Sequence, residues 1–524
     1  MENKEQRASH AEKQALFKGQ MFKKILIANR GEIAVRIIRA CRDLDISPVG
    51  VYSEADREAL HVRLCDEAYD IGAAAASKSY LNIENIIEAA QRSGADAVHP
   101  GYGFLSENSL FAQACEDSQL VFIGPSAASI KLMGDKIMSR ATVEKAGVPS
   151  VPGTAAPLRS VEDALRQAST LGYPLMLKAS AGGGGKGLRV VSRQEDLASL
   201  YQSAFGEAES SFSNSTLYLE KYLSRPRHIE IQVLGDRQGN LVHLGERECS
   251  IQRRHQKLLE ESPSPLVDAD LRERMGQAAL KVARSADYHN AGTVEFLVES
   301  GKTGAECNFY FLEMNTRLQV EHPVTEMVTG IDLVREQILI AAGSRLNYRQ
   351  EDIQPRGAAL ECRIYAEDPR NDFMPSPGTI TTYFETSGPG VRNDSGVRTQ
   401  SQVPVEYDPI IAKVITHGED RDQAIHRMRR TLDEYKIGGV KTTIPFFQAL
   451  LSHPSFIEAK LHTHFIDEHQ ILTSPQGSNY SETVPLVAAA LHHFHQSRKS
   501  PPPAPSRRRP WRHFDRYQDP FRKW

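Results

Sequence analysis

The sequence predicts a multi-domain α/β protein, and three observations point to that fold class. The chain has 524 residues, which is too long for one ordinary hydrophobic core. Hydrophobic residues make up 40% and charged residues 25% of it, which is the balance of a folded globular protein. An apolar run at 24–29 passes through Gly31 into a segment with helical spacing, and this order of strand, turn and helix opens a parallel α/β layer.

Residues 21–134 are expected to form one Rossmann-like α/β domain. The strand at 24–29 is followed by apolar residues at helical spacing over 32–44. A second unit joins a helix at 83–94 to a strand at 97–100. No GxGxxG motif follows the first strand, so a dinucleotide site has no support here.

Two further domains are expected after this first one, and a Pro- and Gly-containing stretch at 148–157 lies near their start. We assign 135–350 to a central domain with a mobile lid at about 150–223, and 351–470 to a C-terminal domain. The C-terminal domain is predicted to contain strands at 358–365, 379–384 and 410–417 and a helix at 421–435.

Both ends of the chain are expected to lie outside these domains. Residues 1–20 are polar and contain no apolar stretch long enough for a signal peptide, so we interpret them as a flexible extension. Residues 471–524 are rich in Ser, Pro, His and Arg and are interpreted as a disordered basic tail. The Arg- and Trp-containing end of this tail either docks a partner protein or has no function.

Charge and cysteine usage limit the partners and the compartment. The formal net charge is −3, so the chain as a whole has no bias toward nucleic acid or membrane. The cysteines are far apart and form no CxxC pair, which indicates reduced thiols and a cytoplasmic protein. No apolar run approaches the roughly 18–20 residues that a membrane span needs.

A glycine-rich segment, GGGGKG at 182–187, predicts a phosphate-binding loop. Four successive glycines let backbone N–H groups turn toward an anion without Cβ clashes. Lys178 and Lys186 would add positive charge for phosphate oxygens. The segment is not a P-loop, because Gly187 and not Ser or Thr follows Lys186. We interpret it as a mobile phosphate lid, with a flexible surface linker as the alternative.

The stretch EMNTRLQVE is the strongest functional signal. If it is extended, Glu313, Asn315, Arg317, Gln319 and Glu321 all face one side. The planar guanidinium of Arg317 suits a carboxylate-like anion, and Glu321 is a candidate general base. A structural salt bridge between these two residues is the alternative interpretation.

Two strand-like runs around 301–304 sharpen this interpretation. A hairpin that turns there would set Glu295 directly opposite Glu313. Two facing carboxylates repel each other unless a positive charge lies between them, and magnesium prefers oxygen ligands. Asn315 would supply a further oxygen. The alternative is a solvated acidic pair on the surface of a sheet.

A basic cluster, QRRHQK at 252–257, predicts an anion site. It follows a run with alternating apolar residues, so it belongs to sheet structure and not to a disordered arm. If the segment stays extended, strand parity groups Arg253, His255 and Lys257 on one side. A solvated basic face is the alternative.

Taken together, these segments resemble biotin carboxylase, the ATP-grasp component of biotin-dependent carboxylases. The resemblance covers about 22–467. It rests on the order and extent of several stretches: ANRGEI at 28–33, HPGYGFLSEN at 99–108, MGDK at 133–136, the glycine loop, QRRHQK at 252–257 and EMNTRLQVEHPVTEM at 313–327.

The resemblance implies a role for each matching residue. The ATP contacts would be Lys136, Lys178, Gly183, Gly184, Gly185, Lys186, Glu220, Lys221, His228, Gln252, His255, Glu295 and Glu313. Magnesium or manganese would be held by Glu295, Glu313 and Asn315. Bicarbonate would be bound by Lys257, Arg317, Gln319, Val320 and Glu321, and biotin by Tyr102 and Arg363. The catalytic residues would be Lys257, Arg317, Glu321 and Arg363. This grouping sets Gln252 beside His255 and Lys257, which differs from the parity argument and implies that the segment is not a regular strand.

The activity implied is ATP-dependent carboxylation of biotin with bicarbonate. Glu321 would deprotonate bicarbonate, which attacks the γ-phosphate of ATP to give carboxyphosphate, and Arg363 would stabilise the deprotonated biotin. No Ala-Met-Lys-Met attachment signature occurs, so biotin is expected on a separate biotin carboxyl carrier protein. A carboxyltransferase subunit is the other expected partner, and the chain is expected to form a homodimer. The final acceptor, an acyl-CoA such as acetyl-CoA or pyruvate, belongs to the transferase. The alternatives are another ATP-grasp ligase and a non-catalytic ATP-binding regulatory subunit.

This sequence departs from the family pattern in two places. Ala181 stands where some relatives carry a further glycine, which an ordinary backbone conformation tolerates. The hairpin loop at 299–307 is longer than usual, although the pair of opposed acids is kept.

Overall fold

A computed structural model describes residues 21–154, 156–179, 188–212, 215–299 and 304–471, together with 487 and 489–491. The chain divides into two compact units, Met1–Thr473 and Ser474–Trp524. All elements named below belong to the first unit. The predicted extension at 1–20, the glycine loop at 182–187 and nearly all of the predicted tail lie outside the described residues.

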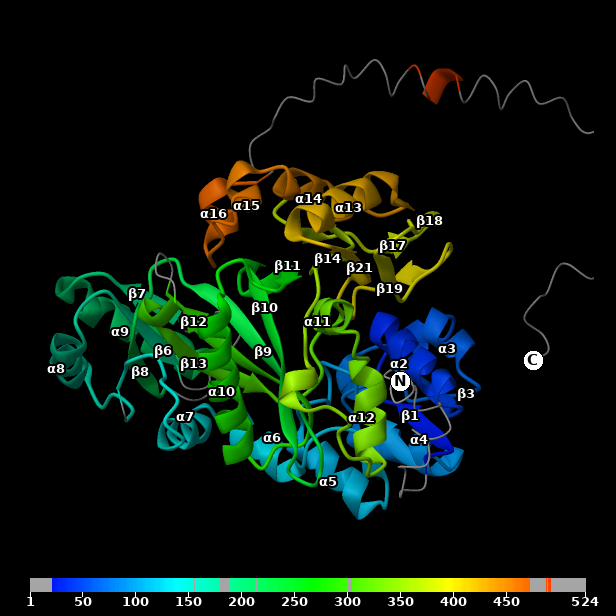
Figure 1. Ribbon diagram of the computed structural model, residues 1–524, viewed down its shortest axis with the longest axis horizontal. Coiled ribbons are helices and arrows are strands. Elements are labelled where there is room, and N and C mark those ends of the chain that lie inside the picture. The colour runs from blue at the N-terminus through cyan, green and yellow to red at the C-terminus, as the bar shows by residue number, and fades with distance from the viewer. Residues whose placement is uncertain are drawn as a thin grey trace, which may run out of the picture. The chain divides into compact units, whose positions relative to one another are not determined.

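The N-terminal part is a parallel sheet with helices on both faces (Figure 1). Its strand order is β3-β2-β1-β4-β5. The strands are β1 (Lys24–Ile27), β2 (Ser47–Tyr52), β3 (Glu67–Asp70), β4 (Ala97–His99) and β5 (Val121–Phe122). The helices are α2 (Gly31–Asp43), α3 (Leu60–Leu64), α4 (Ile83–Ser93), α5 (Ser109–Asp117) and α6 (Ala127–Gly134), with short 3₁₀ turns at Glu54–Asp56 and Ala76–Lys78.

The local sequence explains the first strand–helix unit. Gly31 has a φ of +66°, a left-handed conformation that glycine adopts freely, and α2 begins there. Ile33 and Ile37 of α2 pack against Ile25 and Ile27 of β1 in one apolar cluster. The predicted helices at 32–44 and 83–94 are therefore confirmed to within a residue or two.

A larger antiparallel sheet runs through the middle of the molecule, with strand order β13-β12-β9-β10-β11-β14-β21-β19. One face of β9 carries Ile229, Ile231 and Val233, which pack against helix α10 in an apolar cluster. Because side chains alternate along a strand, the intervening polar residues of β9 face the other side of the sheet. The strands are β9 (Arg227–Gly235), β10 (Leu241–Arg253), β11 (Gln256–Ser262), β12 (Asn290–Val298), β13 (Phe309–Asn315), β14 (Ala358–Tyr365), β19 (Val391–Ser395) and β21 (Ile410–Gly418), and α10 spans Ala269–Ser285.

A third sheet, of order β7-β6-β8, lies within the predicted lid, and α8 and α9 pack on it (Figure 1). It has an apolar cluster of its own, formed by its strands and these two helices. The elements here are α8 (Val161–Leu171), β6 (Leu175–Ala179), β7 (Leu188–Val191), α9 (Gln194–Phe212) and β8 (Leu217–Lys221), and helix α7 (Lys136–Lys145) precedes them and packs against α10 and β13.

Helices α13 to α16 cover the C-terminal strands of the large sheet (Figure 1). Strands at 358–365 and 410–417 are confirmed, but the single strand predicted at 379–384 is wrong. It is split in two, because Ile380 donates its N–H to Ser401 and Thr381 donates its N–H to Gly438. The remaining helices are α11 (His322–Thr329), α12 (Leu333–Ala341), α13 (Arg421–Glu434), α14 (Ile444–Leu451), α15 (Pro454–Ile457) and α16 (Phe465–His469), with 3₁₀ turns at Gly304–Glu306 and Gln350–Asp352. The short strands are β15 (Glu367–Asp368), β16 (Met374–Pro375), β17 (Gly378–Thr379), β18 (Thr382–Phe384), β20 (Gln402–Val403) and β22 (Lys436–Gly438).

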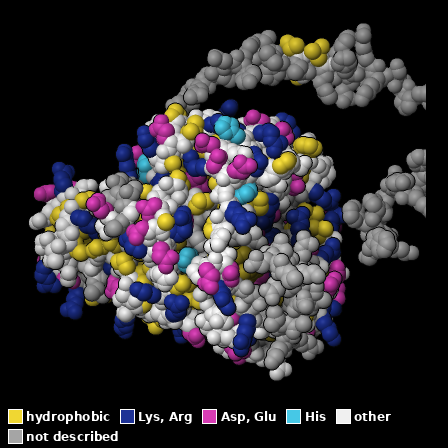
Figure 2. All heavy atoms as spheres, viewed as in Figure 1, with side chains coloured by type: hydrophobic (Ala, Val, Ile, Leu, Met, Phe, Trp, Pro, Cys, Tyr) yellow, Lys and Arg dark blue, Asp and Glu magenta, His cyan; other side chains and the backbone are white. Residues whose placement is uncertain are grey.

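The surface carries both signs of charge. Figure 2 shows Lys and Arg side chains interspersed with Asp and Glu over the face in view, in keeping with the small net charge of the chain. Among the described residues, no helix has the length and apolar character required to cross a membrane.

Candidate active site

The hairpin of β12 and β13 brings two acids together as the sequence predicts. Glu295 pairs directly with Glu313 in the register of the two strands, and Thr293 pairs with Asn315. Glu295 is buried, whereas Glu313 has much of its surface exposed although protein surrounds its carboxyl group. Burial and the charge of Glu295 raise the pKa of Glu313. The charge of Glu295 therefore disfavours ionisation of Glu313, and a cation between the two carboxylates would relieve that repulsion.

The polar strip is extended only as far as Asn315, so the expectation of a strand through Glu321 is wrong. Residues 316–321 are irregular and lead into α11. Glu107 fixes the start of this segment, because its carboxylate accepts hydrogen bonds from Thr316 N at 3.0 Å and Arg317 Nε at 2.8 Å. Glu107 belongs to the HPGYGFLSEN stretch, and it was not among the residues predicted for the site.

The strip still converges on one carboxylate. The side-chain amides of Asn315 and Gln319 donate to Glu295 Oε1 at 2.8 and 2.9 Å. Arg317 donates from its terminal nitrogen to Asn315 Oδ1 at 2.9 Å. Asn315, Arg317 and Gln319 thus come together through contacts made along an irregular backbone, and not because they share one face of a strand.

The basic cluster at 252–257 is a tight hairpin turn between β10 and β11. Arg254 and His255 both have positive φ, at 50° and 66°, which is the conformation of a two-residue hairpin loop. The turn sets Gln252 directly opposite Lys257. The parity grouping of Arg253 with Lys257 is therefore wrong, because the chain reverses between them.

Arg253 points to a different partner from Lys257. Its guanidinium pairs with Asp372 at 2.5 Å and lies 4.7 Å from the ring centroid of Phe373. Arg254 contacts the same carboxylate at 2.9 Å. These two arginines thus hold the turn against the C-terminal part of the chain, whereas Lys257 contacts the buried acids of the site.

The Lys257 ammonium is the centre of the site. It donates to Glu295 Oε1 at 2.9 Å, Glu321 Oε1 at 2.8 Å and Gln319 Oε1 at 3.3 Å, and it also contacts Glu230. Although burial disfavours its charge, these acids raise the pKa of Lys257 well above its usual range. Lys257 is thus a permanent cation to which three carboxylates are drawn.

The acids around Lys257 have pKa values that are shifted in different directions. Burial raises the pKa of Glu321, but Lys257, Arg363 and Arg247 outweigh it and hold that pKa well below its usual value. Lys257 and His228 do the same for Glu295 against its burial. Glu230 has the opposite shift, because burial raises its pKa to about 7. Glu321 is therefore ionised at neutral pH, as a general base must be.

Arg247 belongs to the same network but was not among the residues predicted from the sequence. Its guanidinium is fully buried and donates to Glu230 Oε2 at 3.1 and 3.3 Å and to Gln232 Oε1 at 2.7 Å. It also donates to Thr293 Oγ1 at 2.9 Å and Thr325 Oγ1 at 3.1 Å. The signal was present in GERECS, where charged residues stand inside a strand and so require buried partners.

Arg363 joins the same network from strand β14. Its guanidinium contacts Glu321 Oε2 at 2.9 Å and Glu260 Oε1 at 2.5 Å, and it is buried. Glu321 therefore lies between Lys257 on one side and Arg363 on the other. Tyr102 donates its hydroxyl hydrogen to Glu32, and the charge of Arg363 acts against the burial that raises the Tyr102 pKa.

Several predicted ATP residues lie beside this network or on the three-stranded sheet of β6, β7 and β8. His228 Nε2 lies 2.8 Å from Glu295 Oε2, and Lys178 pairs with Glu220, which also accepts from Arg140 at 3.0 Å. Lys221 donates instead to the carbonyl oxygens of Gly172 and Tyr173, at 2.8 and 3.1 Å.

The remaining ATP candidates lie near these residues or outside the described part of the chain. His255 has a pKa lowered by burial and by the charges of His228, His464 and Lys178, which places it among them. Lys136 lies at the start of α7 and lowers the pKa of Glu313 by its charge, against burial. Gly183, Gly184, Gly185 and Lys186 lie outside the described residues.

The donor set fits a hard cation between Glu295 and Glu313. Among the described residues, two groups have ligand atoms within 4.8 Å of one another: His228, Glu230 and Glu295, and Glu230, Cys249 and Glu321. Both include a nitrogen or sulfur donor, whereas the facing carboxylates of Glu295 and Glu313 supply oxygens, which magnesium prefers. Asn315 directs its amide nitrogen to Glu295 and its oxygen to Arg317. Lys257 also contacts Glu230, Glu295 and Glu321 and supplies positive charge there.

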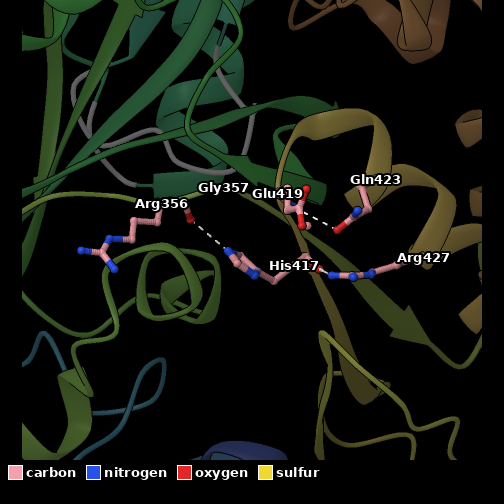
Figure 3. A pocket seen from close by; sticks show the side chains of 7 residues that line it. Arg356, Gly357, His417, Glu419, Gln423 and Arg427 are labelled. Carbon is pink, nitrogen blue, oxygen red and sulfur yellow. Dashed lines mark hydrogen bonds between the residues drawn. The ribbon is translucent and has the colours of Figure 1, made fainter.

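A hollow of about 440 Å³ lies elsewhere, at the far end of β21. Figure 3 shows Arg356, His417, Glu419, Gln423 and Arg427 around it. The polar groups there satisfy one another, because His417 Nε2 lies 2.9 Å from the Arg356 oxygen and Gln423 accepts from Glu419 N at 3.1 Å. None of the predicted site residues lines this hollow, so it does not define the active site.

Comparison with known proteins identifies the family. Family models match three consecutive parts of the chain: the N-terminal domain of biotin carboxylase at 21–130, the ATP-binding domain of the carbamoyl-phosphate synthase L chain at 135–349 and the C-terminal domain of biotin carboxylase at 361–468. A pyruvate carboxylase subunit of Methanothermobacter thermautotrophicus is 54% identical over 450 residues, which is 86% of this chain and 90% of the relative. Biotin carboxylase 1 of Bacillus subtilis is 53% identical over 454 residues, which is 87% of this chain and 100% of the relative.

A solved structure agrees with these sequence matches. The biotin carboxylase domain dimer of the Hydrogenobacter thermophilus 2-oxoglutarate carboxylase, in complex with MgADP, ADP and bicarbonate, has a TM-score of 0.82 and 48% identity. The match covers 88% of this chain and 100% of that one. The fold has three parts, of which the central one is the ATP-grasp region. Together with a network of this composition, it defines an ATP-dependent ligase. The chain belongs to the biotin carboxylase family, and the predicted fold class and family resemblance are confirmed.

Proposed function

We propose that this chain carboxylates biotin on a separate carrier protein, with bicarbonate as the carbon source and magnesium-ATP as the energy source. The observation that carries the proposal is the position of Glu321, which Lys257 holds at 2.8 Å and Arg363 at 2.9 Å. One ionised carboxylate is thus shared between a cation for bicarbonate and a cation for biotin. Another ATP-grasp ligase would need Lys257 but would have no use for Arg363 at this distance.

The chemistry follows from this arrangement. Glu321 takes the proton of bicarbonate, whose oxygen then attacks the γ-phosphorus of ATP, breaks its bond to ADP and forms carboxyphosphate. Carboxyphosphate breaks down to CO₂ and phosphate. The phosphate takes the proton of the biotin ureido nitrogen, and that nitrogen forms the new bond to CO₂. Glu321 releases its proton to solvent before the next cycle.

The positive side chains have distinct tasks in this scheme. Lys257 and Arg317 would bind bicarbonate with Gln319 and Val320, because charge-assisted hydrogen bonds are strong in a buried site. Arg363 would stabilise the negative charge that develops on the ureido oxygen, with Tyr102 beside the ring. We also propose that Glu295, Glu313 and Asn315 would hold magnesium, which neutralises charge on the ATP phosphates when bound.

We propose that ATP binds at the lid end of the network. The residues would be Lys136, Lys178, Gly183, Gly184, Gly185, Lys186, Glu220, Lys221, His228, Gln252, His255, Glu295 and Glu313. We propose the domain division 21–134, 135–350 and 351–470 and a lid at about 150–223. The separate apolar cluster of the three-stranded sheet supports a lid that moves as one body.

The relatives are subunits or domains of carboxylases. We propose that this chain likewise works with a biotin carboxyl carrier protein and a carboxyltransferase subunit, and that it forms a homodimer. The solved relative described as a domain dimer supports the last point. Two of the relatives named above carry the names of a pyruvate carboxylase and a 2-oxoglutarate carboxylase. We propose that the transferase partner sets the acceptor.

The deciding experiment measures ADP release by the purified protein with magnesium, bicarbonate and free biotin, each omitted in turn. We expect release to rise with biotin and to collapse without bicarbonate. Turnover that ignores biotin would instead identify another ATP-grasp ligase. ATP binding without any bicarbonate-stimulated turnover would favour a regulatory subunit.

A further inference from the structure

We propose that Lys413 is a positioning residue that holds the bicarbonate segment and the biotin side of the active site in register. This inference rests on the proposed function and assigns a task to a residue outside the family's predicted site set. Lys413 lies on β21 directly across from Arg363 on β14, in the register of the two strands. Directly paired side chains share one face of a sheet, so Lys413 and Arg363 project toward the same region.

The contacts of Lys413 reach two parts of the site. Its ammonium donates to the carbonyl oxygen of Val320 at 2.7 Å and lies 3.2 Å from Glu32 Oε1. Val320 is followed directly by Glu321, the proposed base. Glu32 accepts the hydroxyl hydrogen of Tyr102, and the Lys413 ammonium lies 5.7 Å from the centroid of the Tyr102 ring. A single cation is thus bonded to the bicarbonate segment and, through Glu32, to the biotin side.

The surroundings make this cation unusual. The Lys413 side chain is 0% exposed, and buried lysines are rare unless they are paired. Its charge also acts on Asp394, its neighbour in β19, and on Glu361 and His322. Lys413 thereby links helix α2, the segment before α11 and the C-terminal strands. A lysine used only to fill space would not need donors aimed at a main-chain oxygen of the proposed bicarbonate site.

The position of Lys413 predicts a specific pattern of kinetic effects. Lys413→Met removes the donor to Val320 and the partner of Glu32 together. We expect kcat/KM for bicarbonate and for biotin each to fall about tenfold to a hundredfold, the range for loss of a charge-assisted hydrogen bond. KM for ATP should change by less than about twofold, because no contact of Lys413 leads to the lid.

Glu32→Gln separates the two connections. Glutamine still accepts from Tyr102, and Lys413 still donates to Val320, but the ion pair between positions 32 and 413 is lost. We therefore expect Glu32→Gln to weaken the biotin parameters while the bicarbonate parameters stay within about twofold of the wild type. A loss of general stability would lower all substrates' parameters alike and would not produce this split.

The test uses full-length protein and varies one substrate at a time. Lys24→Met, which removes a partly exposed lysine paired with Glu67 outside the site, is the matched control. Lys413→Met leaves Glu32 buried without its cation, so Lys413→Met/Glu32→Gln supplies a variant with both charges removed, and thermal unfolding confirms that each variant is folded. Wild-type bicarbonate and biotin parameters in both Lys413 variants would overturn the inference, and so would a uniform loss that follows the folded fraction. A wild-type protein without biotin-dependent turnover would instead refute the proposed function.

Discussion

The replacement of Arg363 by alanine tests the site most directly. The guanidinium contacts Glu321 at 2.9 Å and Glu260 at 2.5 Å in a buried setting. Removal of one preorganised donor to a developing negative charge typically costs about 3 kcal/mol. Because about 1.4 kcal/mol corresponds to a factor of ten, biotin-dependent turnover should fall roughly a hundredfold.

The same substitution also has a predictable cost for stability. Glu260 and Glu321 would keep their burial and lose a cation, and breaking a buried ion pair costs about 3–5 kcal/mol. Lys257 still contacts Glu321 and limits the loss on that side. The double variant Arg363→Ala/Glu260→Gln should therefore melt at a higher temperature than Arg363→Ala and show the same kinetic defect.

The assay is ADP release with and without saturating biotin, together with thermal unfolding. Arg253→Ala is the matched control, because that arginine pairs with Asp372 and not with the site. The reasoning fails if Arg363→Ala keeps near-normal biotin-dependent rates while it is folded. It also fails if the control shows the same loss, since the defect would then belong to the turn and not to Arg363.

Three further substitutions probe the metal pair, the buried arginine and the pH dependence of stability. Glu313→Gln should raise the magnesium concentration needed for half-maximal ADP release by about tenfold or more, whereas exposed Glu306→Gln should not; equal effects would contradict the metal assignment. Arg247→Met should lower the free energy of unfolding by about 3–5 kcal/mol, because it takes one of two cations away from the buried Glu230 and leaves that carboxylate with Lys257 alone, and added Glu230→Gln should restore part of it. Burial and Asp408 raise the pKa of Glu367 to about 7, above the usual 4.5, so its stabilising contribution is present at low pH and is lost as pH rises through 7. Between pH 5 and pH 8, the free energy of unfolding of Glu367→Gln, measured by thermal unfolding, should therefore rise by about 2–3 kcal/mol relative to that of the wild type. A stability difference that does not change with pH would refute the raised pKa of Glu367.

Local patterns in the sequence were enough to predict parts of this site. The facing of Glu295 and Glu313 followed from the length of two strands and one turn, because register in a hairpin is set locally. The helices at 32–44 and 83–94 followed from apolar periodicity, which survives folding when one face packs on a sheet. These features depend on few residues that are close along the chain.

The errors arose where distant segments decide the backbone. Glu107 binds Thr316 and Arg317 across about two hundred positions, and the extended strip ends where it does so. The strand-parity argument treated 252–257 as straight, but the chain reverses at Arg254 and His255. Turns of this kind usually contain glycine, and without glycine the sequence does not indicate the turn. Partners far along the chain are invisible to periodicity.

The charge balance of the site explains why it is assembled from so many strands. Lys257, Arg247 and Arg363 face four buried acids, Glu230, Glu260, Glu295 and Glu321, and His228 adds a fourth positive charge when protonated. Burial lowers the pKa of His228, but Glu295 raises it further, so the protonated form is favoured. The network is therefore close to neutral as a whole. A buried charge without its partner is costly, so no member can be lost alone without a penalty. Single substitutions in this network therefore mix catalytic and structural losses, and only paired variants that remove both members of an ion pair can separate the two.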